Sequence, residues 1–124
     1  MKCPKCSGEM ETVAFGGIEV ERCGGCKGLW FDAREHEKLR DVKGAAATLD
    51  IGDPRPDAGK ETRGKIQCPA CHTQMIQLTI QGKGRLKVES CTVCHGAFFD
   101  AGEFRIYAGG SGIGGLIKGL FGRK

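Results

Sequence analysis

The chain has 124 residues, of which 21 are glycine and 8 are cysteine, and its formal net charge is +4. Aromatic residues make up only 6%, which is too little for one large apolar core, and the charge is far below the basic excess typical of nucleic-acid-binding domains. No apolar run approaches the roughly 18 residues that span a bilayer, so we expect no transmembrane segment. No apolar leader follows Met1, so we expect a cytoplasmic protein. In that reducing compartment, clustered cysteines usually bind metal.

The first unit is expected at residues 1–43 and begins with the turn CPKC. The stretches TVAF and IEVER then flank Gly16-Gly17, a pair suited to a tight turn, and predict a β-hairpin. A second cysteine pair, CGGC, leads through two aromatics into DAREHEKL. The Asp and Glu three residues apart match a helix capping box better than a catalytic pair of carboxylates. We therefore predict a short helix that runs towards residues 42–43 and ends at Gly44.

The composition changes abruptly at residues 44–64. Pro54, Pro56, four glycines and charges of both signs predict a flexible linker rather than a helix or strand. The alanine run at 45–47 is the one part that suits a short extension of the preceding helix.

Residues 65–107 repeat the first unit. The pairs CPAC and CTVC enclose two stretches of alternating apolar residues on either side of the loop QGKGR, which predict a second hairpin. The sequence FFDAGEF then matches the first copy without a gap and predicts a second capped helix, with Phe99 packed on Phe104. Each hairpin is too short to be stable alone, so a metal ion is the expected stabilising element.

The tail at residues 108–124 is rich in glycine, which opposes helix formation. Its apolar residues nevertheless recur at helical spacing. Three interpretations stay open: a flexible tail, a segment that docks on a partner, or a weak helix at a membrane interface. The apolar residues are Ile113, Leu116, Ile117, Leu120 and Phe121.

The cysteines form two quartets, Cys-x2-Cys-x16-Cys-x2-Cys and Cys-x2-Cys-x19-Cys-x2-Cys. Zn²⁺ prefers a tetrahedron of thiolates, and such spacings are typical of zinc sites. Four cysteines fill every position of the tetrahedron, so we predict two structural Zn²⁺ ions per chain and no enzyme activity. The predicted metal ligands are Cys3, Cys6, Cys23, Cys26, Cys68, Cys71, Cys91 and Cys94.

Iron binding and thiol–disulfide catalysis are two other uses of cysteine motifs of this kind. Iron binds the same four-thiolate set and is the less favoured ion. Thiol–disulfide catalysis expects one Cys-x-x-Cys motif at a helix start within a βαβ pattern, whereas this chain has four motifs separated by hairpins. His72 and His95 each follow a cysteine pair, but the quartets are already complete without them.

The motif CPKCSGEM…VERCGGCKGLWFDAREHEKL resembles the TFIIB-type zinc-ribbon (transcription factor zinc-finger) family. The resemblance covers residues 3 to about 42 and, more loosely, 68 to about 107, where Phe98 replaces the family's Trp. It implies two tandem zinc ribbons, a small metal-stabilised α+β fold in which each β-hairpin with two cysteine knuckles precedes a short α-helix. It also implies a link to transcription or nucleic acid.

Two functions follow from these observations. A nucleic-acid-associated regulator would use aromatics for stacking on bases and basic residues for contacts with phosphates, although we favour burial of those aromatics in the small core. The alternative is an adaptor that docks two ribbons and the tail on a protein complex such as the transcription machinery. Neither function uses a small-molecule substrate. The candidate stacking residues are Trp30, Phe31, Phe98 and Phe99, and the candidate phosphate contacts are Arg22, Lys27, Lys83, Arg85 and Lys87.

Overall fold

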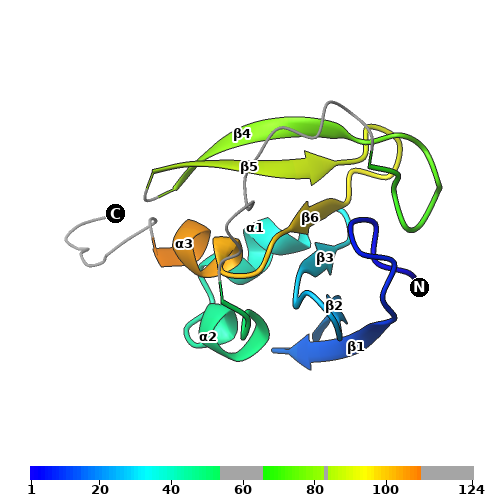
Figure 1. Cartoon of the computed structure of the whole chain (residues 1–124). Coiled ribbons are helices and arrows are strands. Elements are labelled where there is room, and N and C mark those ends of the chain that lie inside the picture. The colour runs from blue at the N-terminus through cyan, green and yellow to red at the C-terminus, as the bar shows by residue number, and fades with distance from the viewer. Residues whose placement is uncertain (54–65, 83, 110–124) are drawn as a thin grey trace.

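The computed structural model describes residues 1–53, 66–82 and 84–109. Most of the expected linker, Lys83 and nearly all of the tail lie outside these residues. Within them, six antiparallel strands form one sheet in the order β1-β2-β3-β6-β5-β4, accompanied by three short helices (Figure 1). The strands are β1 (Met10–Phe15), β2 (Ile18–Cys23), β3 (Leu29–Phe31), β4 (Ile76–Gly82), β5 (Gly84–Ser90) and β6 (Ala97–Phe99), and the helices are α1 (Glu35–Arg40), α2 (Ala45–Leu49) and α3 (Glu103–Gly109).

Each repeat contributes three strands. The two predicted hairpins are β1–β2 and β4–β5, and in both repeats a third, three-residue strand follows the second cysteine pair. These third strands, β3 and β6, pair with each other and join the repeats into a single sheet. In that pairing Trp30 lies opposite Phe98, its own counterpart in the other repeat. The repeats are therefore related by an approximate twofold axis that passes through this pair.

A glycine of each repeat packs against the aromatic residue of the other. A Cβ at Gly28 would overlap the Phe98 ring, and a Cβ at Gly96 would overlap the Trp30 ring. The positive φ angles of these turns fall one residue earlier, at Lys27 (65°) and His95 (64°), so the turns themselves do not require glycine at positions 28 and 96. Close approach of the two repeats, rather than turn geometry, is the reason why no side chain fits at Gly28 and Gly96.

The three helices gather between the two hairpins (Figure 1). Phe31 and Phe99 are fully buried beneath them and meet edge to face with ring centroids 5.4 Å apart. Phe99 also contacts Phe104 at 5.6 Å, which confirms the predicted packing of these two residues. The ring of His36, on α1, packs on Phe31 and on Tyr107, so this histidine belongs to the same aromatic cluster.

The helix starts follow only part of the capping-box prediction. Glu35 and Glu103 each accept a hydrogen bond from the backbone N–H three residues earlier, at 3.3 and 3.1 Å. The carboxylate of Asp32 instead accepts a hydrogen bond from the indole N–H of Trp30. The carboxylate of Asp100 accepts a hydrogen bond from the ammonium group of Lys5. The glutamates thus hold the turn before each helix, whereas the aspartates bind side chains elsewhere.

The segment after α1 differs from the expected linker. α1 ends at Arg40, and a separate helix, α2, buries Ala45 and Leu49 in the core. Asp50 then accepts hydrogen bonds from the backbone N–H groups of Gly102 (2.8 Å) and Arg105 (2.9 Å) at the start of α3. This part of the chain is therefore tied to the second repeat. None of the described helices is long and apolar enough to cross a membrane.

Candidate metal centres

The eight cysteines come together as two groups of four. In each group the four sulfur atoms lie within 4.8 Å of one another, and no cysteine is in a disulfide. The sulfurs of Cys3 and Cys26 lie 3.7 Å apart and those of Cys6 and Cys23 lie 3.3 Å apart, and the matching distances in the second group are 3.6 and 3.2 Å. A tetrahedron with metal–sulfur bonds of 2.3 Å has sulfurs about 3.8 Å apart. Both groups therefore fit one tetrahedral metal ion each.

Each cysteine pair lies on a tight turn that directs backbone N–H groups towards sulfur. In the turn after β2, the N–H groups of Gly25 and Cys26 donate to the Cys23 sulfur at 3.3 and 3.4 Å. Corresponding hydrogen bonds reach Cys68 and Cys91. These donors stabilise negative charge on sulfur and lower the cost of holding four thiolates together.

The same turns require a left-handed residue directly after the second cysteine. Non-glycine residues occupy this position in all four turns, with φ between 62° and 66°: Ser7, Lys27, His72 and His95. A side chain in this region costs about 1 kcal/mol relative to glycine. The metal-binding turns therefore carry backbone strain, which metal coordination offsets.

Proton affinities within the groups also favour metal binding. A hydrogen bond from Cys3 lowers the pKa of Cys26 to about 5. In the second group, hydrogen bonds from Thr73 and Cys91 lower the pKa of Cys71 to about 6. Each group thus contains a thiolate at neutral pH, and a metal ion would displace the protons of the remaining thiols.

The sequence matches the family described as transcription factor zinc-finger, Zn_ribbon_TFIIB, over residues 2–42 and 67–108. These two segments span more than half of the chain and coincide with its two repeats. The protein belongs to this zinc-ribbon family. The predicted fold class, two tandem zinc ribbons in a small α+β protein, is thereby confirmed. Neither the curated proteins nor the solved structures contain a match to the chain.

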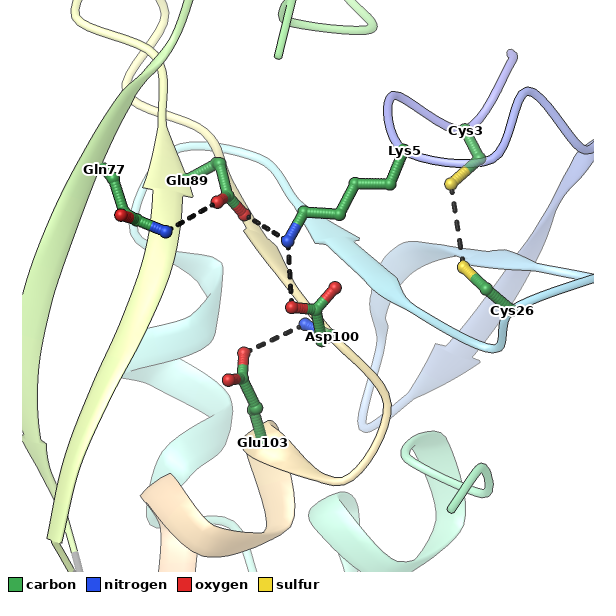
Figure 2. Close-up of polar contacts among 7 residues, drawn as sticks. All are labelled: Cys3, Lys5, Cys26, Gln77, Glu89, Asp100 and Glu103. Atoms are coloured by element: carbon green, nitrogen blue, oxygen red, sulfur yellow. Dashed lines mark hydrogen bonds and ion pairs between the residues drawn. The ribbon is translucent and has the colours of Figure 1, made fainter. Parts of the chain in front are cut away.

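The two zinc ribbons meet at a buried polar cluster (Figure 2). The ammonium group of Lys5, from the first cysteine turn, lies 2.9 Å from Glu89 on β5 and 2.8 Å from Asp100 after β6. Gln77 donates to the other oxygen of Glu89 at 3.2 Å. The side chains of Glu89 and Asp100 are 1% and 5% exposed, so Lys5 neutralises acidic groups that have almost no access to water.

Burial controls the ionisation of this cluster. It lowers the pKa of Lys5, but the ion pairs with Asp100 and Glu89 outweigh it and leave that pKa raised. Burial raises the pKa of Glu89, against the opposing effect of Lys5. Burial, assisted by the charge of Asp100, raises the pKa of Glu103 to about 7. Lys5 of the first ribbon thus faces the buried carboxyl groups of Glu89 and Asp100, and the cluster connects the two ribbons.

The sequence alone does not predict this cluster. Lys5 occupies the variable position of the first CPxC turn, where the second ribbon has Ala70, so the repeat comparison gave it no weight. Glu89 falls in step with Arg85 and Lys87 on the polar positions of the expected strand, so its burial and its need for a cation could not be read from the sequence.

The candidate stacking aromatics do not reach the surface. Trp30 is 1% exposed, and Phe31, Phe98 and Phe99 are fully buried. The expectation that they form the core of the small fold is confirmed. They cannot stack on the bases of a nucleic acid in this conformation.

The candidate phosphate contacts are only partly available. Arg22 donates a hydrogen bond to the backbone oxygen of Leu49 at 3.1 Å. Lys27 is half-buried, and its side chain packs on Gly52. Lys87 is exposed on β5, Arg85 pairs through its backbone with Gln81, and Lys83 lies outside the described residues. Arg22 and Lys27 thus contact the first ribbon itself, Lys87 is exposed, and phosphate binding by this set stays a prediction.

Proposed function

We propose that the chain binds two structural Zn²⁺ ions, one in each cysteine quartet, and has no catalytic activity. The sulfur separations, the thiolate-stabilising turns and family membership support this assignment. Four cysteine ligands leave no coordination position for water or substrate. The free cysteines agree with a reducing, cytoplasmic location.

Metal analysis of the purified chain tests this assignment. We expect about two zinc ions per chain, and about one in the Cys91→Ser variant. Chelation of the metal should replace the circular dichroism spectrum of the folded protein with that of an unfolded chain. Iron as the resident metal, or an unchanged spectrum after complete metal removal, would contradict it.

We further propose that this zinc-ribbon protein acts in transcription by binding protein rather than nucleic acid. The burial of all four candidate stacking aromatics is the observation that supports this choice. The modest net charge and the engagement of Arg22 with Leu49 support it as well. Stacking and phosphate contacts are the two main sources of affinity for single strands, and this surface offers little of either.

The outer strands of the sheet are the proposed contact surface. Among the described strands, β1 and β4 are the two outermost of the sheet, and each pairs with one other strand along its length. An extended segment of a partner protein can add a strand to such an edge. Because β3 and β6 join the ribbons into one sheet, both edges belong to one rigid body rather than to two tethered modules.

Binding to purified RNA polymerase of the source organism, after nuclease treatment, tests the proposal against its rival. We expect the zinc-loaded chain to co-elute with the polymerase, and Lys87→Ala to change neither this binding nor its salt dependence. Titration with single- and double-stranded nucleic acid provides the comparison. Micromolar binding to nucleic acid with a steep salt slope that Lys87→Ala reduces, and no binding to the polymerase, would establish the nucleic-acid function instead.

A further inference from the structure

Within the part of the chain that the structure describes, some of the core-facing side of β4 is left uncovered. Leu78 lies opposite Val88, and Ile80 lies opposite Leu86, so these side chains share one face of the sheet. Val88 and Leu86 are buried in the core, yet Leu78 is 41% exposed and Ile76, on the same face, is 45% exposed. α3 contacts β4 but does not cover these two residues.

The first ribbon has a cover at the corresponding place. There Val13 lies opposite Val20, as Leu78 lies opposite Val88. Val13 and Phe15 are partly buried against the core, and α2 contacts their strand, β1. At the start of α2, a Cβ at Gly44 would lie 3.5 Å from the Phe15 ring. The segment that follows the helix of the first ribbon thus folds back over its outer strand.

The sequence after α3 repeats the positions that make this cover. From the second cysteine pair onwards, each residue of the first ribbon has its counterpart 68 positions later, as in Cys26 and Cys94. Continued without a gap, this register relates Gly44 to Gly112, Ala45 to Ile113 and Leu49 to Ile117. Gly44 begins α2 with a φ of 86°, and Ala45 and Leu49 are the residues that α2 buries.

We propose that the C-terminal segment, residues 110–124, packs on the uncovered strip of β4 through Ile113 and Ile117. The segment begins directly after α3, which contacts β4, and residues 110–113 can span about 13 Å. Leu78 and Ile76 lie within about 13 Å of Ile80 along the strand. Ile113 has a larger apolar side chain than Ala45, its counterpart in α2. The larger side chain suits the strip on β4, which is more exposed than the corresponding residues of β1.

This occupant matches the strip better than an external protein does. The internal repeat supplies both the place and the register, and the effective concentration of a segment joined to α3 is in the millimolar range. The inference concerns the face of β4 and not its outer edge. It therefore does not depend on the proposed function, and the edge stays open to a partner.

Methyl NMR of the full-length, zinc-loaded protein tests the proposal. We expect nuclear Overhauser contacts between the Ile117 and Leu78 methyl groups. Ile117→Asp should abolish these contacts and speed amide exchange in β4 about tenfold, the factor carried by burial of one isoleucine side chain.

Leu116→Asp is the matched control, because Leu116 corresponds to the exposed Thr48. It should leave both the contacts and the exchange unchanged. Equal effects of the two variants, or no effect of Ile117→Asp, would refute the proposed register. Contacts that appear only between differently labelled copies in a mixed sample would assign the strip to a second chain and overturn the proposal.

Discussion

Replacing Gly28 by alanine tests whether the two ribbons fold as one body. A Cβ at this position would overlap Phe98, since even the third-nearest ring carbon lies only 3.1 Å away. Phe98 is fully buried at the centre of the sheet and has no space to move aside. Overpacking of this kind costs about 1–3 kcal/mol of unfolding free energy, and we expect about 2 kcal/mol. Because the φ angle of Gly28 is not positive, the backbone itself accepts alanine.

Guanidinium denaturation followed by circular dichroism in excess zinc measures this cost. Gly24→Ala is the control, because its Cβ would meet only Glu9 at an ordinary 3.6 Å. Phe98→Leu removes the outer ring carbons, so in that background Gly28→Ala should barely change the unfolding free energy. The double-mutant cycle should then give a coupling energy of about 2 kcal/mol between positions 28 and 98. An equal cost in both backgrounds would mean that the strain is local to the cysteine turn, and the reciprocal packing would be refuted.

Three further predictions concern the polar cluster and the cysteine turns. Lys5→Met leaves buried carboxylates without their cation and should lower the unfolding free energy by about 3–5 kcal/mol. Lys2→Met, which removes an exposed ion pair, should leave the unfolding free energy unchanged. Similar losses in the two variants would contradict the role of Lys5 in neutralising buried carboxylates. The pKa of Glu103 is raised from 4.5 to about 7, so the native state binds more protons between these values and loses stability as pH rises through them. Glu103→Gln should therefore be about 1–2 kcal/mol more stable than the parent at pH 8 and equal to it near pH 5, and a pH-independent difference would exclude this explanation. Glycine should relieve the left-handed backbone of the cysteine turns, so we expect the unfolding free energy to rise by about 1 kcal/mol in Ser7→Gly and in His72→Gly. Thermal unfolding measures this change, and no gain in stability would mean that the turns are unstrained.

The features that could be predicted from the sequence are local ones. The spacing of the cysteines predicted two metal sites, and alternating apolar residues on either side of glycine-containing turns predicted both hairpins. Glu35 and Glu103 were correctly placed at helix starts, because a capping box involves only four consecutive residues. The burial of the aromatics followed from the small amount of apolar material in the chain.

The features that were missed depend on contacts between the repeats. LWF and AFF are three-residue strands buried on both faces, so they show no alternation from which pairing could be read. α2 has only five residues, and its burial and the contacts of Asp50 with α3 keep it in place more than its own propensity does. The packing of Gly28 on Phe98 was equally hidden, because the two residues are 70 positions apart in the sequence.

The pairing of Trp30 with Phe98 has a consequence for how such a protein could originate and change. A residue that meets its own counterpart across a twofold axis marks an interface that a single ribbon could form with an identical copy. Joining two ribbons in one chain removes the translational entropy that such a dimer loses on association and makes the pairing independent of concentration. It also allows the sequences of the two ribbons to diverge, as at Lys5, where the second ribbon has Ala70. Substitutions at Gly28 and Phe98 should then be inherited together, since each limits the size of the other.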